Sequence, residues 1–205
     1  MVLPTPGKPV TTMTLTFGII ELYALRRRQY AAEMTLHDST IQFRGRVITV
    51  TVDDVTLPNG HRALLEIVHH PGGAAVVAID KERRVCLLRQ HRHAVGGFLW
   101  ELPAGKLEPD EPPLHTAQRE LVEEAGTEAQ TWDSLGTCTP SPGVMREVVH
   151  LFLATGLLPT ASAPESAEVF EVHWVPLVDA HQWVVDGTIN DAKTALGLIR
   201  AMHRI

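Results

Sequence analysis

One segment of this chain has the spacing of a helix, and the segments on both sides of it have the spacing of strands. Pro112 and Pro113 suit a helix start, and Gly126 supplies a C-terminal stop. Between them, apolar residues recur at helical spacing: Leu114, Ala117, Leu121 and Ala125. A helix with one apolar side must pack on another element. The sequence therefore predicts a layered α+β domain.

Strand patterns begin at Ile41 and continue to Gly105. Residues 41–55 alternate apolar and polar side chains, and Asn59-Gly60 marks a hairpin turn. Further strands are expected at 74–80, 85–92, 131–138, 147–157 and 170–177, and helices at 177–186 and 190–203. Residues 1–40 are predicted to be an N-terminal extension, and residues 41–205 to form the main domain.

Charge and composition exclude several classes of function. A formal net charge of −6 argues against general nucleic-acid binding, which needs a basic face. The chain has two cysteines and no uninterrupted apolar run long enough for a membrane span, so a cytoplasmic protein without a disulfide framework is expected. An anionic substrate would need local arginines or metal cations to offset the negative charge.

Three carboxylates share one side of the predicted helix. Offsets of three and four residues bring Glu120, Glu123 and Glu124 to one face, where they repel one another unless a cation binds them. Oxygen ligands held together in this way suit Mg²⁺ or Mn²⁺, although a solvated acidic face has the same pattern. Arg119 is expected to point away from Glu120 and to pair with Glu111.

The spacing around this helix resembles the Nudix hydrolase box. The matching residues stand at each fixed position of that box: Gly105, Glu111, Arg119, Glu120, Leu121, Glu123, Glu124 and Gly126. One position departs from it, because Thr127 replaces the usual aliphatic residue after the final glycine. The resemblance implies a Nudix-type α/β/α sandwich with a mixed sheet.

Flanking segments are similar to the ADP-ribose pyrophosphatase branch of that superfamily. They are WELPAGKLE before the box and TPSPGVMREVVHLFLA after it, where Pro142 occupies a position typical of the branch. The similarity covers roughly residues 41–200. It implies Mg²⁺-dependent hydrolysis of ADP-ribose to AMP and ribose 5-phosphate, with Mn²⁺ able to substitute. Another nucleoside diphosphate sugar, such as GDP-mannose, is the alternative substrate, and a non-catalytic ADP-ribose sensor is the alternative class.

The resemblance also implies roles for individual residues. Glu120, Glu123 and Glu124, with the main-chain carbonyl of Ala104, would bind the metal ions. Arg92 would contact the substrate phosphates, and Glu101 would bind substrate or hold Arg92. In relatives the general base comes from an acidic loop, which here offers Glu168 first and Glu165 second; Ser166 stands where relatives often have an acid.

Two further expectations concern partners and other metals. In relatives the N-terminal strands of a partner subunit often hold the adenine, so the resemblance implies a homodimer, with the first strands, residues 41–70, as a candidate dimerisation element. His91 and His93 alternate on one strand and so share a face, but no third ligand follows at a spacing suited to zinc. The resemblance implies a nucleotide sugar as the small-molecule partner. From the net charge and the lack of a long apolar run, neither nucleic acid nor a membrane is expected as a partner.

Overall fold

The computed structural model describes residues 34–161 and 169–205. These residues divide into two compact units, one formed by 34–41 with 51–66 and the other by 42–50 with 67–205. No helix in the described parts of the chain is long and apolar enough to cross a membrane.

Most of three strands forms the first unit, and these strands neighbour one another in the order β1-β2-β3: β1 (Thr35–Arg44), β2 (Thr49–Thr56) and β3 (Arg62–His69). The predicted turn at Asn59-Gly60 is confirmed, with Gly60 at a φ of 84°. The alternating segment 41–55 is not one continuous strand, because the Gly45 N–H bonds the Ile48 carbonyl at 2.8 Å in a turn between β1 and β2. β1 also begins six residues early, in a polar stretch where the Ser39 hydroxyl donates to Asp53 at 2.6 Å.

The second unit contains a mixed sheet in the order β7-β4-β10-β8 and a second sheet in the order β11-β5-β6. Its strands are β4 (Gly73–Ala78), β5 (Arg84–Arg92), β6 (Gly97–Glu101), β7 (Ala104–Lys106), β8 (Thr127–Cys138), β9 (Met145–Arg146), β10 (Val149–Pro159) and β11 (Phe170–Pro176). β10 runs parallel to β4 and antiparallel to β8. The end of β3 pairs with β9 through Val68 and His69.

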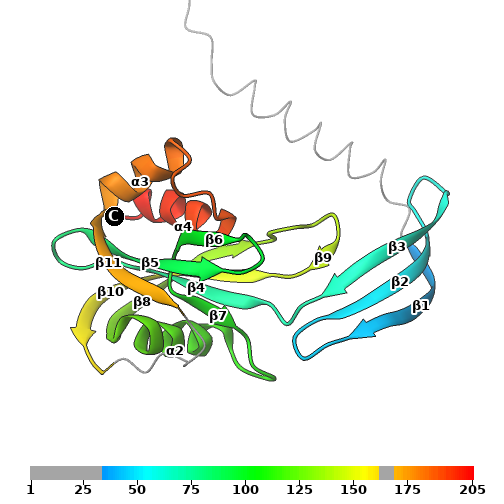
Figure 1. Ribbon diagram of the computed structural model, residues 1–205, viewed down its shortest axis with the longest axis horizontal. Helices are drawn as coiled ribbons and strands as arrows, with labels where there is room; N and C mark the ends of the chain where they lie inside the picture. Colours follow the sequence, from blue (N-terminus) through cyan, green and yellow to red (C-terminus); the bar gives the residue numbers. More distant parts are fainter. Residues whose placement is uncertain (1–33, 162–168) are drawn as a thin grey trace, which may run out of the picture. The chain divides into compact units, whose positions relative to one another are not determined.

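Helices cover both sides of these sheets. α2 (Pro113–Ala125) lies on one side, and α3 (Leu177–Val185) and α4 (Ala192–Met202) lie on the other (Figure 1). The predicted α+β fold, an α/β/α sandwich around a mixed sheet, is confirmed. Pro112 and Gly126 bound α2 as predicted, and Gly126 has the left-handed conformation (φ 56°) that suits a helix stop.

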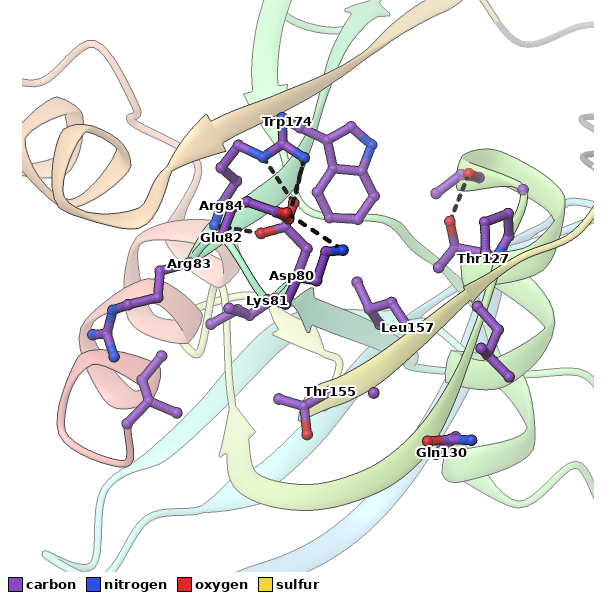
Figure 2. A pocket seen from close by; sticks show the side chains of 17 residues that line it. Asp80, Lys81, Glu82, Arg83, Arg84, Thr127, Gln130, Thr155, Leu157 and Trp174 are labelled. Carbon is purple, nitrogen blue, oxygen red and sulfur yellow. Dashed lines mark hydrogen bonds and ion pairs between the residues drawn. The ribbon is translucent and has the colours of Figure 1, made fainter.

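A charged turn joins β4 to β5 and is closed by its own ion pair. The Arg84 main-chain N–H and the Arg84 Nε each donate to one carboxylate oxygen of Asp80, both at 2.8 Å (Figure 2). Arg83, between them, has a positive φ of 59°. The side chain of Asp80 thus fixes the point where the chain leaves one sheet for the other.

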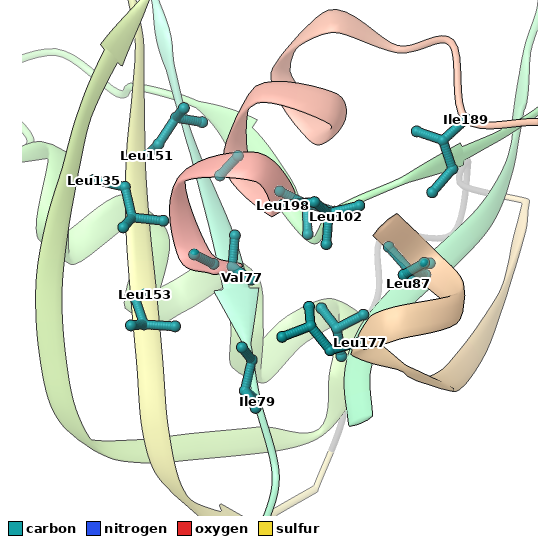
Figure 3. Packing of buried hydrophobic residues seen from close by; sticks show 14 of the residues in the cluster. Val77, Ile79, Leu87, Leu102, Leu135, Leu151, Leu153, Leu177, Ile189 and Leu198 are labelled. Atoms are coloured by element: carbon teal, nitrogen blue, oxygen red, sulfur yellow. The ribbon is translucent and has the colours of Figure 1, made fainter. Parts of the chain in front are cut away.

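β4 is buried on both faces, which explains its uninterrupted apolar sequence. Ala75 and Val77 face the larger core cluster, together with Leu102 and Leu198 (Figure 3). Ala74, Val76 and Ala78 alternate with them and face the second cluster, which includes Ala117 and Leu121 of α2. One strand therefore carries α2 on one face and α4 on the other.

Candidate active site

A cleft of about 400 Å³ lies where β4 and β7 meet the first turns of α4 and one face of α2. Arg92, Ala104, Glu120 and Glu123 line it, so four of the predicted site residues are brought together. The other residues that line it are His70, Gly72, Gly73, Ala74, Gly105, Lys106, Pro140, Glu147, Val149, Asp191 and Lys193. The cleft collects carboxylates, basic side chains and main-chain groups in one place.

Arg119 binds three of the box carboxylates at once. Its Nη1 donates to Glu120 Oε1 at 2.7 Å and to Glu123 Oε2 at 3.0 Å. Its Nε donates to Glu111 Oε1 at 3.2 Å. The predicted pairing with Glu111 is confirmed, but the expectation that Arg119 points away from Glu120 is wrong. A long side chain can bend back across its own helix, so neighbouring positions do not fix opposite directions for the two charged groups.

The carboxylate of Glu120 lies against Gly105 of β7. A side-chain carbon built onto Gly105 would overlap the Glu120 carboxyl group, which therefore lies directly against the backbone of β7. Gly105 pairs with Ala74 of β4, so the position of this backbone is set by the sheet. The sheet and the helix together hold a carboxylate against main-chain atoms.

Glu124 lies behind the cleft and is bonded to the same strand. It is 2% exposed, and its Oε2 accepts the Ala104 N–H at 2.8 Å. This bond fixes the peptide group between Pro103 and Ala104, directly before the Ala104 carbonyl, which is the predicted main-chain ligand. Glu120 is also nearly buried, whereas the side chain of Glu123 is 31% exposed. Exposure to solvent therefore increases from Glu124 through Glu120 to Glu123.

Arg92 and Glu101 form a bidentate ion pair at the edge of the cleft. Arg92 Nε and Nη2 donate to the two carboxylate oxygens of Glu101 at 2.8 and 3.0 Å. Burial acts to raise the pKa of Glu101, but the bonds from Arg92 and Lys193 outweigh it and hold the pKa below its ordinary value. Of the two roles expected for Glu101, binding substrate or holding Arg92, this contact corresponds to the second.

The Arg119 guanidinium lowers the pKa of the Glu111 carboxyl to about 2, with help from the Thr116 hydroxyl and the Glu108 N–H. A lowered pKa means that the ionised pair stabilises the fold above the unfolded pKa of Glu111, and that this stabilisation is lost as the pH falls toward 2. Substituting Glu111→Gln should therefore lower the free energy of unfolding by roughly 1 kcal/mol at pH 7.

Urea unfolding of both proteins at pH 7 and pH 3 checks this expectation. The difference between wild type and Glu111→Gln should shrink at pH 3, because the unfolded wild-type chain then binds a proton that the folded chain resists. A difference that stays constant between the two pH values would contradict the assigned ion pair.

No group of three or more His, Cys, Asp or Glu side chains within residues 34–161 and 169–205 is arranged to hold a metal ion. His91 instead packs edge-on against the ring of Phe98, with 5.2 Å between ring centres. The box carboxylates nevertheless fit a cation, because Glu120 and Glu123 already bind the same nitrogen of Arg119. A hard divalent ion prefers this set of oxygen donors.

The sequence predicted four residues of the cleft, Arg92, Ala104, Glu120 and Glu123, but not the wall formed by Asp191 and Lys193 at the start of α4. Lys193, in the first turn of α4, donates to Glu101 at the end of β6 and to Asp191, the residue before α4. Glu147 lies at the cleft beside His70, with 3.1 Å between the carboxylate and the imidazole. The signal for Asp191 was present, since an aspartate before a helical pattern is a typical N-cap. Glu165 and Glu168, the predicted bases, lie outside the described residues.

A second and larger cavity, of about 860 Å³, shares no lining residue with this cleft. It is lined by the β4–β5 turn, the end of α2 and the end of β10, and Leu157 and Trp174 are among its apolar lining residues (Figure 2). Its best-placed charges, Asp80 and Arg84, already bind each other. The chemistry of the site therefore belongs to the smaller cleft.

The fold is shared with a solved hydrolase. The crystal structure of an ADP compounds hydrolase matches with a TM-score of 0.71 and 23% sequence identity, covering 84% of this chain and 95% of the other. A likeness at this level of identity concerns the arrangement of the elements.

Sequence comparison then narrows the class. The NUDIX domain model matches residues 69–194, a range that holds the whole cleft. The chain therefore belongs to the NUDIX family and is a Nudix hydrolase.

The methanol dehydrogenase activator of Bacillus methanolicus is 39% identical over 158 residues, 76% of this chain and 85% of that protein. The ADP-ribose pyrophosphatase of Bacillus subtilis is 41% identical over 158 residues, with the same two coverages.

Proposed function

We propose that this protein hydrolyses the diphosphate bond of ADP-ribose and releases AMP and ribose 5-phosphate. The observation that carries the proposal is the pairing of two carboxylates on one cationic nitrogen, in a cleft that also presents a guanidinium. Binding of a diphosphate substrate has two requirements. Carboxylates must bind a cation, and an arginine must bind the oxyanions of the substrate. The relative from Bacillus subtilis supplies the choice of ADP-ribose.

The residues proposed to bind metal are Glu120, Glu123, Glu124 and the carbonyl of Ala104. Nudix ADP-ribose pyrophosphatases generally need a divalent metal ion, and we propose Mg²⁺, with Mn²⁺ able to replace it. Such ions neutralise the diphosphate, polarise phosphorus and lower the pKa of bound water. Arg119 must release Glu120 and Glu123 when these ions bind, because one set of oxygens cannot serve both cations fully.

The remaining chemistry falls to side chains of the chain itself. Arg92 binds a phosphate oxygen, and Glu101 fixes the plane of its guanidinium. A carboxylate is needed to orient the attacking water and accept its proton. We propose Glu168 for this task and Glu165 as the substitute, on the resemblance of their segment to the acidic loop of relatives.

Residues 41–205 are proposed as the Nudix domain, with residues 1–40 as an extension and strands within 41–70 as a dimerisation element. All ten residues of β1 are exposed, and Leu36, Ile41 and Phe43 are each about half exposed (54%, 49% and 55%). An end strand with exposed apolar side chains favours pairing with another chain. The proposed assembly is a homodimer in the cytoplasm.

The test is incubation with a nucleotide panel and Mg²⁺, followed by chromatography of the products. The panel holds ADP-ribose, GDP-mannose, ADP-glucose, NADH and a diadenosine polyphosphate. The proposal expects AMP and ribose 5-phosphate from ADP-ribose, formed faster than any other product. Faster release of mannose 1-phosphate would move the assignment to another nucleoside diphosphate sugar. Tight ADP-ribose binding with no turnover of any compound would make the protein a sensor.

A further inference from the structure

The first turn of α4 is hydrogen-bonded to the chain segment that leads from β6 into β7. Asp191 caps the helix by accepting the Thr194 N–H at 3.0 Å and the Thr194 hydroxyl at 2.6 Å. Thr194, itself fully buried, accepts the Leu102 N–H at 2.9 Å. Leu102 directly follows Glu101 and lies two residues before Ala104. The bond therefore ties the start of α4 to the segment that carries both of these residues.

Lys193 extends from this fixed turn to Glu101. Its Nζ donates to Glu101 Oε2 at 2.5 Å and to Asp191 Oδ2 at 3.0 Å, and its side chain is 17% exposed. The same oxygen of Glu101 also accepts from Arg92 Nη2. Lys193 and Arg92 therefore share one carboxylate that is 2% exposed, and both line the cleft.

The balance of charge explains what Lys193 does for Arg92. Alone, Arg92 and Glu101 would form a neutral pair, and a neutral pair attracts an anion only as a dipole. Lys193 adds a positive charge to the pair. Asp191, which Lys193 also contacts, shares its negative charge between Lys193 and the Thr194 N–H and hydroxyl at the N-terminus of α4, so it offsets the charge of Lys193 only in part. The bonds to Glu101 use Nε and Nη2 of Arg92, so Nη1 is the nitrogen left for an oxyanion.

We propose that Lys193 is a positioning residue for Arg92. By neutralising Glu101, it leaves the charge of the guanidinium available to the diphosphate and so sets the affinity for the substrate. The proposal rests on the proposed function, since it names the residue that tunes the same cleft. It acts through two ion pairs and involves no contact of Lys193 with the substrate.

Calorimetric titration with ADP tests the proposal without any turnover. Lys193→Met, which keeps the stem and removes the charge, should weaken ADP binding about tenfold. Lys193→Arg, which keeps the charge, should restore the affinity to within about threefold of wild type. The matched control is Lys81→Met, at a lysine that is 89% exposed on the β4–β5 turn, and it should bind ADP like wild type.

Steady-state kinetics with the best substrate of the panel give a second readout. Lys193→Met should raise KM about tenfold and leave kcat within about threefold, because the charge acts on binding. If Lys193→Met does not fold, Lys193→Gln carries the same expectation, as it keeps a donor without the charge.

Several results would overturn the proposal. They are unchanged ADP affinity in Lys193→Met, equal losses in Lys193→Met and Lys193→Arg, a fall in kcat at constant KM, and no ADP binding by the wild type. A protein that bound ADP but hydrolysed no nucleotide would defeat the proposed function, and the ADP titrations would still decide the role of Lys193.

Discussion

Substituting Glu124→Gln should lower kcat/KM by about a thousandfold, the scale expected when several kcal/mol of metal-assisted stabilisation of the transition state are lost. Glutamine keeps the size of the side chain and an oxygen that can accept the Ala104 N–H, so the bond at 2.8 Å can persist. The substitution removes a buried negative charge, and a divalent ion needs the ionised carboxylate as a ligand.

The fold itself should tolerate this change, which separates a catalytic role from a structural one. Without added metal, the midpoint of thermal unfolding of Glu124→Gln should equal or exceed that of wild type, because one of three neighbouring like charges is gone. Glu128→Gln is the matched control, since Glu128 is an exposed glutamate four residues further on, and it should keep full activity. Full activity in Glu124→Gln would remove Glu124 from the proposed metal ligands.

Substituting Glu101→Gln should lower the free energy of unfolding by about 3 kcal/mol, because removing one partner of a buried ion pair leaves the others uncompensated. The carboxylate is 2% exposed and accepts bonds from both Arg92 and Lys193. Urea unfolding at pH 7 measures the change. Activity should fall as well, since Arg92 loses the partner that fixes its plane.

The loss of stability in Glu101→Gln should depend on pH in a definite direction. The pKa of Glu101 is held below its ordinary value, so its contribution to stability is present above the unfolded pKa and is lost as the pH falls through the folded one. The gap between wild type and Glu101→Gln should therefore narrow in acid. Asp54→Asn removes an ion pair with Arg62, whose side chain is 67% exposed, and should leave the urea midpoint nearly unchanged.

The sequence predicted the elements whose signals are local. Pro112 and Gly126 marked the ends of α2 because proline and glycine restrict the backbone wherever they stand. The apolar run within residues 74–80 predicted the strand β4. The start of β1 was missed because its exposed, polar side chains have no alternating pattern, and hydrogen bonds such as Ser39 to Asp53 replace it.

The site was predictable to the extent that its residues lie within one motif. The spacing of Glu120, Glu123 and Glu124 along α2 fixes their shared face, so a local pattern was enough. Lys193 approaches Glu101 from 92 positions away in the chain, and only the packing of α4 on β4 brings the two together. The direction of Arg119 depended on the bend of a flexible side chain, which spacing does not encode.

The small residues of the core determine how far apart the two walls of the cleft stand. α2 and α4 lie on opposite faces of β4, and each supplies one wall. Ala74 and Ala75 let both helices approach the strand, and a side-chain carbon on Gly197 of α4 would come within 2.8 Å of Leu102. A single added methyl group at such a position would shift Lys193 relative to the carboxylates. Substrate preference in such a protein can therefore drift through changes that no ligand ever touches.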